Sequence, residues 1–412
     1  MLDARNVTAI VVTYNRLPLL KQCLAALRAQ TVQGFTVLLV DNASTDGTAD
    51  YIKTLAMPGL VCRNPGENLG GAGGFAYGIR AAAELEPNDI SLYVGIPFCP
   101  TRCAYCSFVS QSIERFGEFL PAYLDALLRE IAHTGALLKN SGFHIRTLYM
   151  GGGTPTTLSA RQLDALCTQL DAAFDLSALR EFTVEAGRPD TITADKLHVL
   201  RAHRVDRISV NPQTLDDRVL ETIGRRHTAQ DIYDALQLVR TTGGFAVNMD
   251  LIAGLPGDTP DGFRTTLEQV LALAPENITV HTLSRKRGAD LSQQTAPVPD
   301  GAQVGEMLDF ANTALNTAGY APYYLYRQKF MSGGFENVGW TRPGQENLYN
   351  ICIMEELCSI LAMGGGASTK LVRPNGGRLE RHIDPKYPTE YIANIDPVSY
   401  THLRAHETTL HL

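Results

Sequence analysis

The chain has 412 residues, of which 44% are hydrophobic and 19% are charged, and its formal net charge is −7. A chain of this length and composition buries a sizeable core and normally forms two or three domains. The negative charge disfavours nucleic acid as a partner, and the charged fraction is too small for a disordered polyanion. No stretch approaches the roughly 18 apolar residues of a membrane span, and the N-terminus has no signal-peptide pattern. We therefore expect a cytoplasmic protein with no membrane partner.

The first segment alternates strand and helix patterns. Apolar runs predict strands at residues 8–14 and 35–41, and an amphipathic pattern predicts a helix at residues 17–29. Ser44 and Thr45 favour the start of a second helix. The turns after both strands lie at the carboxyl ends, where open α/β sheets bind ligands.

Three motifs in this segment resemble the nucleotide-sugar half of family 2 glycosyltransferases. They are VVTYNR, LLVDNASTDGT and NLGGAGGF, the last at residues 68–75. The resemblance implies an incomplete Rossmann-like fragment of GT-A type, in which Thr13, Asn15 and Asp41 contact a uridine nucleotide. That family also needs an Asp-x-Asp pair and an acceptor half, but here the chain turns into a different pattern. We interpret the segment as truncated and catalytically inactive, and NLGGAGGF by itself reads as a loop near a helix start.

From residue 91 the alternation becomes regular. Strands are predicted at residues 91–97, 145–152, 181–187, 207–213, 246–256 and 277–283. The clearest helices between them are at residues 114–139, 159–174 with Ser159 as the N-cap, 193–203 and 259–274. Six strands with five crossovers predict an α/β fold in which helices cover a parallel sheet, either curved into an open barrel or doubly wound. In both cases the chemistry belongs at the carboxyl ends of the strands.

The stretch GIPFCPTRCAYCSF places Cys99, Cys103 and Cys106 in the loop after the first of these strands. A tetrahedral zinc site usually needs two short-spaced ligand pairs, and no second pair lies at a suitable distance. Three thiolates can instead bind three irons of a 4Fe-4S cluster and leave the fourth iron open to a small molecule. A group of core or redox thiols is the alternative. The other cysteines read as ordinary buried thiols: Cys23, Cys62, Cys167, Cys352 and Cys358.

The C-x3-C-x2-C loop and the following YMGGGTP resemble the radical S-adenosylmethionine superfamily, over about residues 91–395. In that superfamily S-adenosylmethionine chelates the open iron, and one electron cleaves it to a 5′-deoxyadenosyl radical that abstracts hydrogen. Further motifs resemble the oxygen-independent coproporphyrinogen III oxidases, especially the HemZ-like branch. These motifs are EFTVEAGRPDTI, RISVNPQTLDD, NMDLIAGLPGDT, YYLYRQKF and GFENVGW. The fold that the resemblance implies is a partial (β/α)6 barrel.

The same resemblance implies a set of cofactor contacts at the strand ends. They are Tyr93, Tyr105, Gly152, Gly153, Thr154, Glu185, Gln213, Arg225 and Asp250. The glycines would let the backbone approach the methionine end of the cofactor, and Glu185 would accept a hydrogen bond from it. From the residues alone, Glu185 and Asp250 also fit hydrated strand-end carboxylates, and Arg225 fits an exposed charge run, GRRHT.

The implied activity is oxidative decarboxylation of coproporphyrinogen III, in which propionates become vinyl groups, with a donor such as flavodoxin or ferredoxin. Arg327 and Lys329 are candidate anchors for the remaining propionates. The typical oxidases carry CGC at the third cysteine, whereas here Ser107 follows Cys106, as in the HemZ branch and the related haem chaperones. A haem chaperone without turnover is therefore the first alternative, and a sugar transferase acting through the first segment is the second.

Four regions are expected. Residues 1–88 form the glycosyltransferase-like fragment, 89–285 the barrel, 286–396 a region that covers the substrate, and 397–412 a disordered tail. The tail resembles the conceptual translation of a sequencing adapter, although its His402 and His406 also have the spacing of a helical metal pair. We interpret the whole chain as a chimera.

Overall fold

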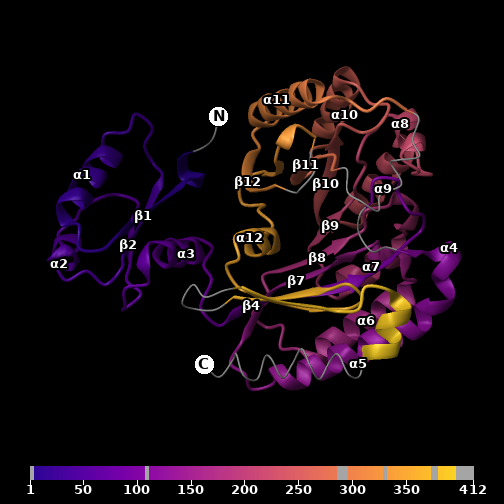
Figure 1. Cartoon of the computed structure of the whole chain (residues 1–412), viewed down its shortest axis with the longest axis horizontal. Coiled ribbons are helices and arrows are strands. Elements are labelled where there is room, and N and C mark those ends of the chain that lie inside the picture. Colours follow the sequence, from indigo (N-terminus) through magenta and orange to yellow (C-terminus); the bar gives the residue numbers. More distant parts are fainter. Residues whose placement is uncertain (1–3, 107–110, 285–295, 328–331, 373–378, 396–412) are drawn as a thin grey trace.

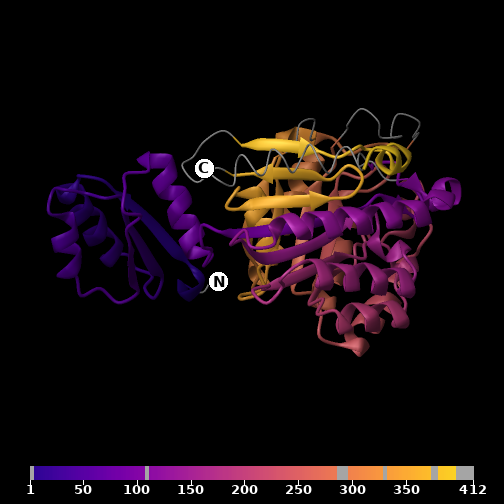
Figure 2. The same cartoon turned by 90° about the horizontal axis from the view of Figure 1, so that it is seen from below.

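The computed structural model describes residues 4–106, 111–284, 296–327, 332–372 and 379–395 (Figure 1). Over these ranges the strands form a three-stranded sheet, an eleven-stranded sheet and a two-stranded ribbon. The three-stranded sheet belongs to the N-terminal segment, which lies to one side of the larger unit in both views (Figures 1 and 2). No described helix is long and apolar enough to cross a membrane.

The N-terminal sheet is parallel, with its strands in the order β1 (Thr8–Thr13), β2 (Thr36–Asp41) and β3 (Leu60–Arg63). Its helices are α1 (Leu17–Arg28), α2 (Thr48–Lys53) and α3 (Gly70–Ala82). Ala9 and Val11 belong to the apolar cluster that includes residues of α1, whereas the alternate residues Ile10 and Val12 face α3. Because successive strand residues point to opposite faces, α1 and α3 cover the two sides of this sheet.

The glycine-rich motif at residues 68–75 was predicted to be a loop near a helix start. The helix start is there, at Gly70, but most of the motif lies within α3 and not in a loop. A Cβ atom at Gly74 would lie 2.6 Å from Val12 Cγ1, and one at Gly78 would lie 2.6 Å from Ile10 Cγ2. The glycines therefore allow the helix backbone to approach the sheet more closely than a side chain would permit.

Two other expectations for this segment are wrong. Ser44 and Thr45 do not start a helix: α2 begins at Thr48, and both residues instead form hydrogen bonds with Asn15. Cys23 and Cys62 are exposed rather than buried.

The larger sheet contains the six predicted parallel strands. They are β4 (Asp89–Ile96), β7 (His144–Gly152), β8 (Glu181–Glu185), β9 (Arg207–Ser209), β10 (Ala246–Ala253) and β11 (Asn277–Thr282). The helices between them are α4 (Ile113–Phe116), α5 (Leu120–Leu138), α6 (Ala160–Ala173), α7 (Ala194–Ala202), α8 (Asp217–Thr222), α9 (Ala229–Thr242) and α10 (Pro260–Leu273). The predicted α/β fold, a partial barrel of six strands, is confirmed.

Local sequence accounts for two details of these helices. Ser159 caps α6 through a capping box with Gln162, as predicted. The helix expected at residues 114–139 is instead divided into α4, a 3-10 turn at Gly117–Phe119, and α5. Pro121 lies in the first turn of α5, where its missing N–H costs nothing, so the helix restarts there.

Successive side chains along each strand point to opposite faces of the sheet, so one face packs into the core and the other faces the site. Leu92, Val94, Leu148 and Met150 are fully buried in the main apolar cluster, which includes residues of the outer helices. The residues between them, such as Tyr149, have side chains on the opposite face of the sheet. Polar and aromatic groups can therefore gather inside the curve of the sheet without interrupting its core.

The C-terminal region extends the same sheet at both edges, which the sequence analysis did not predict. On one edge β14 (Ser359–Met363) pairs in parallel with β4 and is followed by β15 (Ser368–Leu371) and β16 (Glu380–Ile383). On the other edge β13 (Asn337–Thr341) pairs antiparallel with β11, and β12 (Ala321–Tyr326) lies outside it. Helices α11 (Gly301–Thr317) and α12 (Leu348–Met354) belong to this region. The yellow strands β14 to β16 are seen side by side in Figure 2.

The end of the N-terminal segment contacts the larger unit. Leu85 is buried in a small cluster with Leu348 and Cys352, and Arg180 donates a 2.9 Å hydrogen bond to the carbonyl of Ala83. Cys352 and Cys358 are both buried, as predicted, but they also lie in contact with each other. Nothing in the spacing of these two cysteines predicted this contact.

Candidate active site

A cavity of about 340 Å³ lies at the carboxyl ends of the parallel strands. Nearly all of the predicted site residues line it: Cys99, Cys103, Tyr105, Cys106, Gly152, Gly153, Thr154, Glu185, Gln213, Arg225 and Asp250. They come from segments spread over more than a hundred residues, and the sheet brings them to one end.

Tyr93 is the exception, because it does not line the cavity. Its ring stacks 6.2 Å from the ring of Tyr149 and 6.3 Å from that of Tyr349, measured between centroids. Its hydroxyl lies 3.2 Å from where a Cβ atom would stand on Gly152. Tyr93 therefore supports the cavity wall from behind.

The cysteine loop is positioned by bonds to neighbouring strand ends. Cys99 ends the short strand β5 (Phe98–Cys99), which pairs with β6 (Gln111–Ser112). The Thr154 hydroxyl lies 3.4 Å from the Cys99 sulfur, and the Cys106 amide donates to the carbonyl of Cys103. All three thiols are partly exposed, unlike the buried Cys167.

Arg188 is a further site residue. It lies within the motif EFTVEAGRPDTI, but the sequence pattern did not indicate a role for it. It follows β8, is only 3% exposed, and donates from Nη1 to the Thr101 hydroxyl at 3.1 Å. The same nitrogen lies 3.8 Å from the Cys103 sulfur. Arg188 therefore fixes the loop and places a buried positive charge next to the Cys103 sulfur.

Gly153, directly after β7, stands where the neighbouring backbone leaves no room for a side chain. A Cβ atom on Gly153 would lie 2.6 Å from the Phe98 carbonyl oxygen, which is too close for any real contact. The amides of Gly153 and Thr154 donate to the carbonyls of Ile96 and Phe98. This packing fixes the floor of the cavity next to the cysteine loop.

Glu185 is half-buried at the end of β8 and accepts a 2.6 Å hydrogen bond from the Tyr149 hydroxyl. Burial raises the pKa of its carboxyl to about 7, and the neighbouring Asp250 adds to the increase, although the bond from Tyr149 opposes it. Glu185 therefore lies on the cavity wall with its carboxyl held by Tyr149.

Asp250 lies on β10, and its pKa is shifted in the opposite direction. Burial would raise its pKa, but the interactions with His281, Asn248 and Thr279 outweigh it and leave the pKa below its usual value. Asn248 Nδ2 donates to Oδ1 at 2.8 Å, and Asn211 Nδ2 donates to Oδ2 at 2.8 Å. Two carboxyl groups in one cavity thus have pKa values that are pushed apart, a pattern typical of functional sites.

Gln213 and Arg225 approach the cavity from the segment after β9. Gln213 has a left-handed backbone, with φ at 66°, and its buried Oε1 has no hydrogen-bond partner among the described residues. Arg225 is buried, not part of a solvated charge run, and donates to the Asn211 carbonyl at 2.6 Å. Burial disfavours its charge, but Tyr105 and Cys103 more than offset this and raise the pKa of Arg225.

The C-terminal region supplies the remaining wall of the cavity through Tyr324, Tyr326, Asn337, Asn350 and Met354. The sequence did not single these residues out, because β12 joins the sheet only through β13, which pairs with the earlier strand β11, and α12 contacts the distant strand β7. Of the two anchor candidates, Arg327 is not among the residues that line the cavity. Arg327 is 62% exposed at its side chain and pairs with Glu336 at 2.8 Å, and Lys329 lies outside the described residues, as do His402 and His406.

The donor set fits the two cofactors that the sequence implies. Three thiols stand beside a glycine floor, and buried polar atoms of Gln213, Arg225 and Arg188 have no hydrogen-bond partner among the described residues. Over that part of the chain no three Cys, His, Asp or Glu side chains converge on one point as for a single metal ion. A 4Fe-4S cluster does not require such convergence, because its thiolates bind separate irons.

Comparisons with known proteins agree with this geometry. The sequence model of the Radical SAM superfamily matches residues 93–270, and that of glycosyl transferase family 2 matches residues 8–84. The oxygen-independent coproporphyrinogen-III oxidase-like protein HemZ of Bacillus subtilis is 42% identical over 307 residues, which are 74% of this chain and 61% of that protein. The heme chaperone HemW of Lactococcus lactis is 36% identical over 328 residues, which are 76% of this chain and 78% of that protein.

A solved structure is also similar. Coproporphyrinogen III oxidase HemN from Escherichia coli, described as a radical SAM enzyme, superposes with a TM-score of 0.61 at 25% identity, covering 78% of this chain and 73% of that chain. The fold and the cysteine loop thus define a member of the radical S-adenosylmethionine superfamily. Within it, the chain belongs to the family that contains the oxygen-independent coproporphyrinogen III oxidases and their HemZ and HemW relatives.

The family confirms the expected cofactors, a 4Fe-4S cluster and S-adenosylmethionine. The resemblance of the first segment to family 2 glycosyltransferases is confirmed as well. The chain spans 61% of the length of HemZ, and relatives in the family carry two kinds of name, oxidase and chaperone.

Proposed function

We propose that this protein is a coproporphyrinogen III dehydrogenase of the radical S-adenosylmethionine type. In each turnover a propionate side chain of the substrate would lose a β-hydrogen, one molecule of CO₂ and one electron, and become a vinyl group. The observation that carries the proposal is the single cavity in which the cysteine loop, two carboxyl groups and a wall of tyrosines meet.

The residues have distinct roles under this proposal. Cys99, Cys103 and Cys106 would bind the cluster, whose bound S-adenosylmethionine supplies a carbon radical that abstracts hydrogen. Glu185, with its pKa of about 7, can share a proton with a donor group of the cofactor. Asp250 stays ionised and is oriented by Asn211 and Asn248, so it can accept hydrogen bonds from hydroxyl or amino groups.

The wall formed by β12 and α12 supports a ring-shaped substrate. Tyr324 and Tyr326 are stacked with an interplanar angle of 12° and centroids 6.3 Å apart. Aromatic faces of this kind offer apolar area together with hydroxyl groups, which suits a tetrapyrrole that carries polar side chains. A closed wall also excludes water from a radical reaction.

The test is anaerobic reconstitution with iron and sulfide, followed by an assay with S-adenosylmethionine and a low-potential reductant. Conversion of coproporphyrinogen III into a divinyl product, with cofactor cleavage that depends on the substrate, would support the proposal. Cofactor cleavage without any change in the tetrapyrrole would contradict it.

A haem chaperone is the second candidate, and the similarity to HemW over 78% of that relative favours it. A chaperone would bind haem stoichiometrically and return it unchanged. The same reconstituted protein, titrated with haem and followed by absorbance, separates the two: tight haem binding without decarboxylation supports the chaperone.

A further inference from the structure

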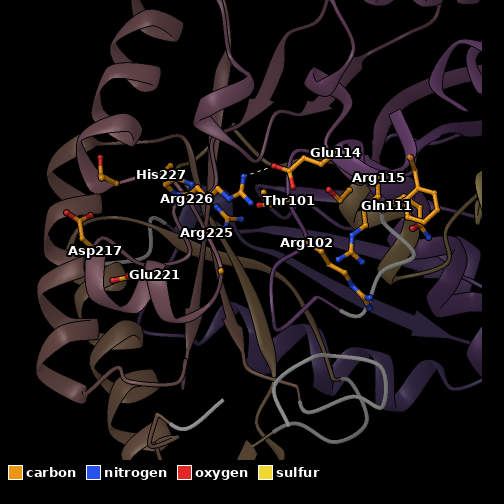
Figure 3. Close-up of a pocket in the computed structure, with 14 residues that line it drawn as sticks. Thr101, Arg102, Gln111, Glu114, Arg115, Asp217, Glu221, Arg225, Arg226 and His227 are labelled. Carbon is orange, nitrogen blue, oxygen red and sulfur yellow. Dashed lines mark hydrogen bonds and ion pairs between the residues drawn. The ribbon is translucent and has the colours of Figure 1, made fainter. Parts of the chain in front are cut away.

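Two further features lie outside the cavity described above. One is a second pocket, of about 810 Å³, which contains both acidic and basic side chains, among them the 2.6 Å ion pair of Arg226 and Glu114 (Figure 3). The other is a pair of thiols, Cys352 and Cys358, which belong to one small buried cluster at the end of α12. The thiol pair has a chemistry of its own, because two cysteines in contact can form a disulfide.

A tight turn at the end of α12 brings the two cysteines together. The Leu357 amide donates to the Cys352 carbonyl at 3.2 Å, and Glu356 before it has a left-handed backbone, with φ at 52°. Both are features of a Schellman motif, in which the chain reverses directly after a helix. Cys358 therefore returns to the side of Cys352, where the two thiols are in hydrogen-bond contact.

The neighbours of Cys358 favour its thiolate form. The Thr147 hydroxyl donates to Ser91 at 2.7 Å, which leaves the Ser91 proton for the Cys358 sulfur, 3.4 Å away. The hydrogen bond with Cys352 lowers the pKa of the Cys358 thiol, and Ser91 lowers it further, although burial opposes them. The thiolate is the form of cysteine that attacks oxidants, so Cys358 is the more reactive member of the pair.

The N-terminal fragment also contributes to this pair. Arg80 lies on α3, and its buried Nε has no hydrogen-bond partner among the described residues. Its positive charge helps to lower the pKa of Cys358. Cys167 has a different environment, since burial raises the pKa of its thiol to about 12. Burial alone therefore does not explain the state of Cys358.

The helix that carries Cys352 is also part of the cavity wall. Asn350, two residues earlier, lines the cavity. The ring of Tyr349 stacks on that of Tyr149, with centroids 4.4 Å apart, and Tyr149 in turn donates to Glu185. Because a covalent bond is shorter than the contact it replaces, joining the two sulfur atoms would move the end of α12 and the wall with it.

We propose that Cys352 and Cys358 are a site of reversible disulfide formation, with a small hydroperoxide as oxidant, and that the disulfide changes the cavity wall formed by α12. Cys352 is fully buried and Cys358 is 6% exposed, so the oxidant has to be small. This inference goes beyond the proposed function and does not depend on the reaction that the cavity performs.

The oxidation takes two steps. The Cys358 thiolate attacks one oxygen of the peroxide, the O–O bond breaks, and the departing hydroxide takes up the proton that the thiol lost, which gives water and a sulfenic acid. The Cys352 sulfur then attacks the Cys358 sulfur, and the S–O bond breaks. The hydroxyl group leaves with the Cys352 proton as a second water. Two thiols thus lose two electrons, and one peroxide becomes two waters.

The test treats the full chain with hydrogen peroxide, blocks the remaining free thiols and maps tryptic peptides by mass spectrometry. Both cysteines lie in the peptide of residues 330–370, which contains no other cysteine. This peptide should lose two hydrogens, take up no blocking reagent and return to the dithiol with dithiothreitol. Cys167 should stay a free thiol. A dithiol peptide after treatment, or one joined to another cysteine peptide, would overturn the proposal.

The role of Cys358 as the attacking thiol is tested by rate. Arg80→Gln should slow disulfide formation about threefold, because the fraction of thiolate falls. Arg28→Gln is the matched control, since it removes the same charge from an exposed position on α1 of the same fragment. Equal rates in both variants would overturn this assignment.

Hydrogen exchange tests the effect on the wall. Backbone amides of residues 348–354 should exchange about threefold faster or slower in the oxidised chain than in the reduced chain, whereas those of α6 should not change. Cys358→Ser, treated identically, controls for oxidation of the cysteine loop. Equal exchange in the two states, or the same change in Cys358→Ser, would overturn the proposal. Neither measurement uses a tetrapyrrole, so failure of the proposed function is a separate result.

Discussion

Cys99, Cys103 and Cys106 differ from the other cysteines because they are partly exposed and line one cavity. We predict that Ala in place of any one of them removes most of the bound iron and acid-labile sulfide after reconstitution, since three thiolates hold the cluster. Cys167→Ala is the control, because Cys167 is buried in α6. Equal loss of iron in that variant would contradict the assignment.

Arg188 carries a prediction about redox potential. Its guanidinium lies 3.8 Å from the Cys103 sulfur in a buried setting, so its positive charge stabilises the reduced, more negative cluster. Arg188→Gln should therefore shift the midpoint potential to a lower value, measured by redox titration with electron paramagnetic resonance. Arg188→Lys should recover part of the shift, because lysine restores the positive charge but lacks the planar guanidinium group.

If Arg188→Gln loses cluster content but keeps the same midpoint potential, Arg188 only supports the loop and does not influence the potential of the cluster. Arg226→Gln is the matched control. It removes the same charge from an exposed side chain that pairs with Glu114 instead of a cysteine.

At the scale of elements, a buried acid fastens the C-terminal region to α5. Glu130 accepts a hydrogen bond from the Gly364 amide at 2.9 Å and another from the Tyr391 hydroxyl. Burial raises the pKa of Glu130 to about 7, although both hydrogen bonds oppose this. Asp384, buried nearby, has its pKa raised to about 9 by burial and by Glu130.

These raised pKa values make folding stability depend on pH. An acid whose pKa is higher in the folded state contributes its full stability below the unfolded value, near 4.5 for Glu130, and loses that contribution as pH rises through about 7. We therefore expect the unfolding temperature to fall between about pH 5 and pH 9. Glu130→Gln should flatten this slope in calorimetric scans; an unchanged slope would show that other groups cause it.

The elements also show what sequence patterns can and cannot reveal. The six parallel strands, β4 and β7 to β11, were predictable because each is an apolar run next to a helical pattern. The family resemblance then named Glu185, Gln213 and Asp250, and these residues line the one cavity at the carboxyl ends of the strands. Arg188 was missed because a lone arginine after a strand resembles a solvent-facing residue. Tyr324 and Asn350 were missed because β12 reaches the sheet only through β13, which pairs with β11, and because α12 contacts the distant strand β7. Local sequence periodicity does not indicate such contacts.

At the scale of the whole molecule, Asp41 and Asp46 of the N-terminal fragment form hydrogen bonds within that fragment. Asp41 accepts from the Ser44 amide at 3.0 Å and from Asn64 at 3.3 Å, and Asp46 accepts from the Leu17 amide at 2.9 Å. These hydrogen bonds orient both carboxylates toward turns of the fragment itself, so a divalent cation on a sugar diphosphate would have to compete with them.

We therefore predict that calorimetric titration of the full chain with uridine diphosphate sugars and manganese shows no binding tighter than millimolar. Reconstituted protein should cleave S-adenosylmethionine at the same rate with and without these sugars. Micromolar binding, or sugar transfer to any acceptor, would make the N-terminal fragment a functional part of the protein.

The placement of β14 has a consequence for how the protein is made. Ile90 of β4 pairs with Ser359 of β14, so one flank of the first barrel strand stays open until nearly the whole chain has left the ribosome. Contacts between such distant residues form slowly, and an open strand edge invites pairing with other chains in the meantime. Synthesis at low temperature, which slows translation and aggregation together, should increase the soluble yield, and any chain shortened before residue 359 should accumulate as insoluble protein.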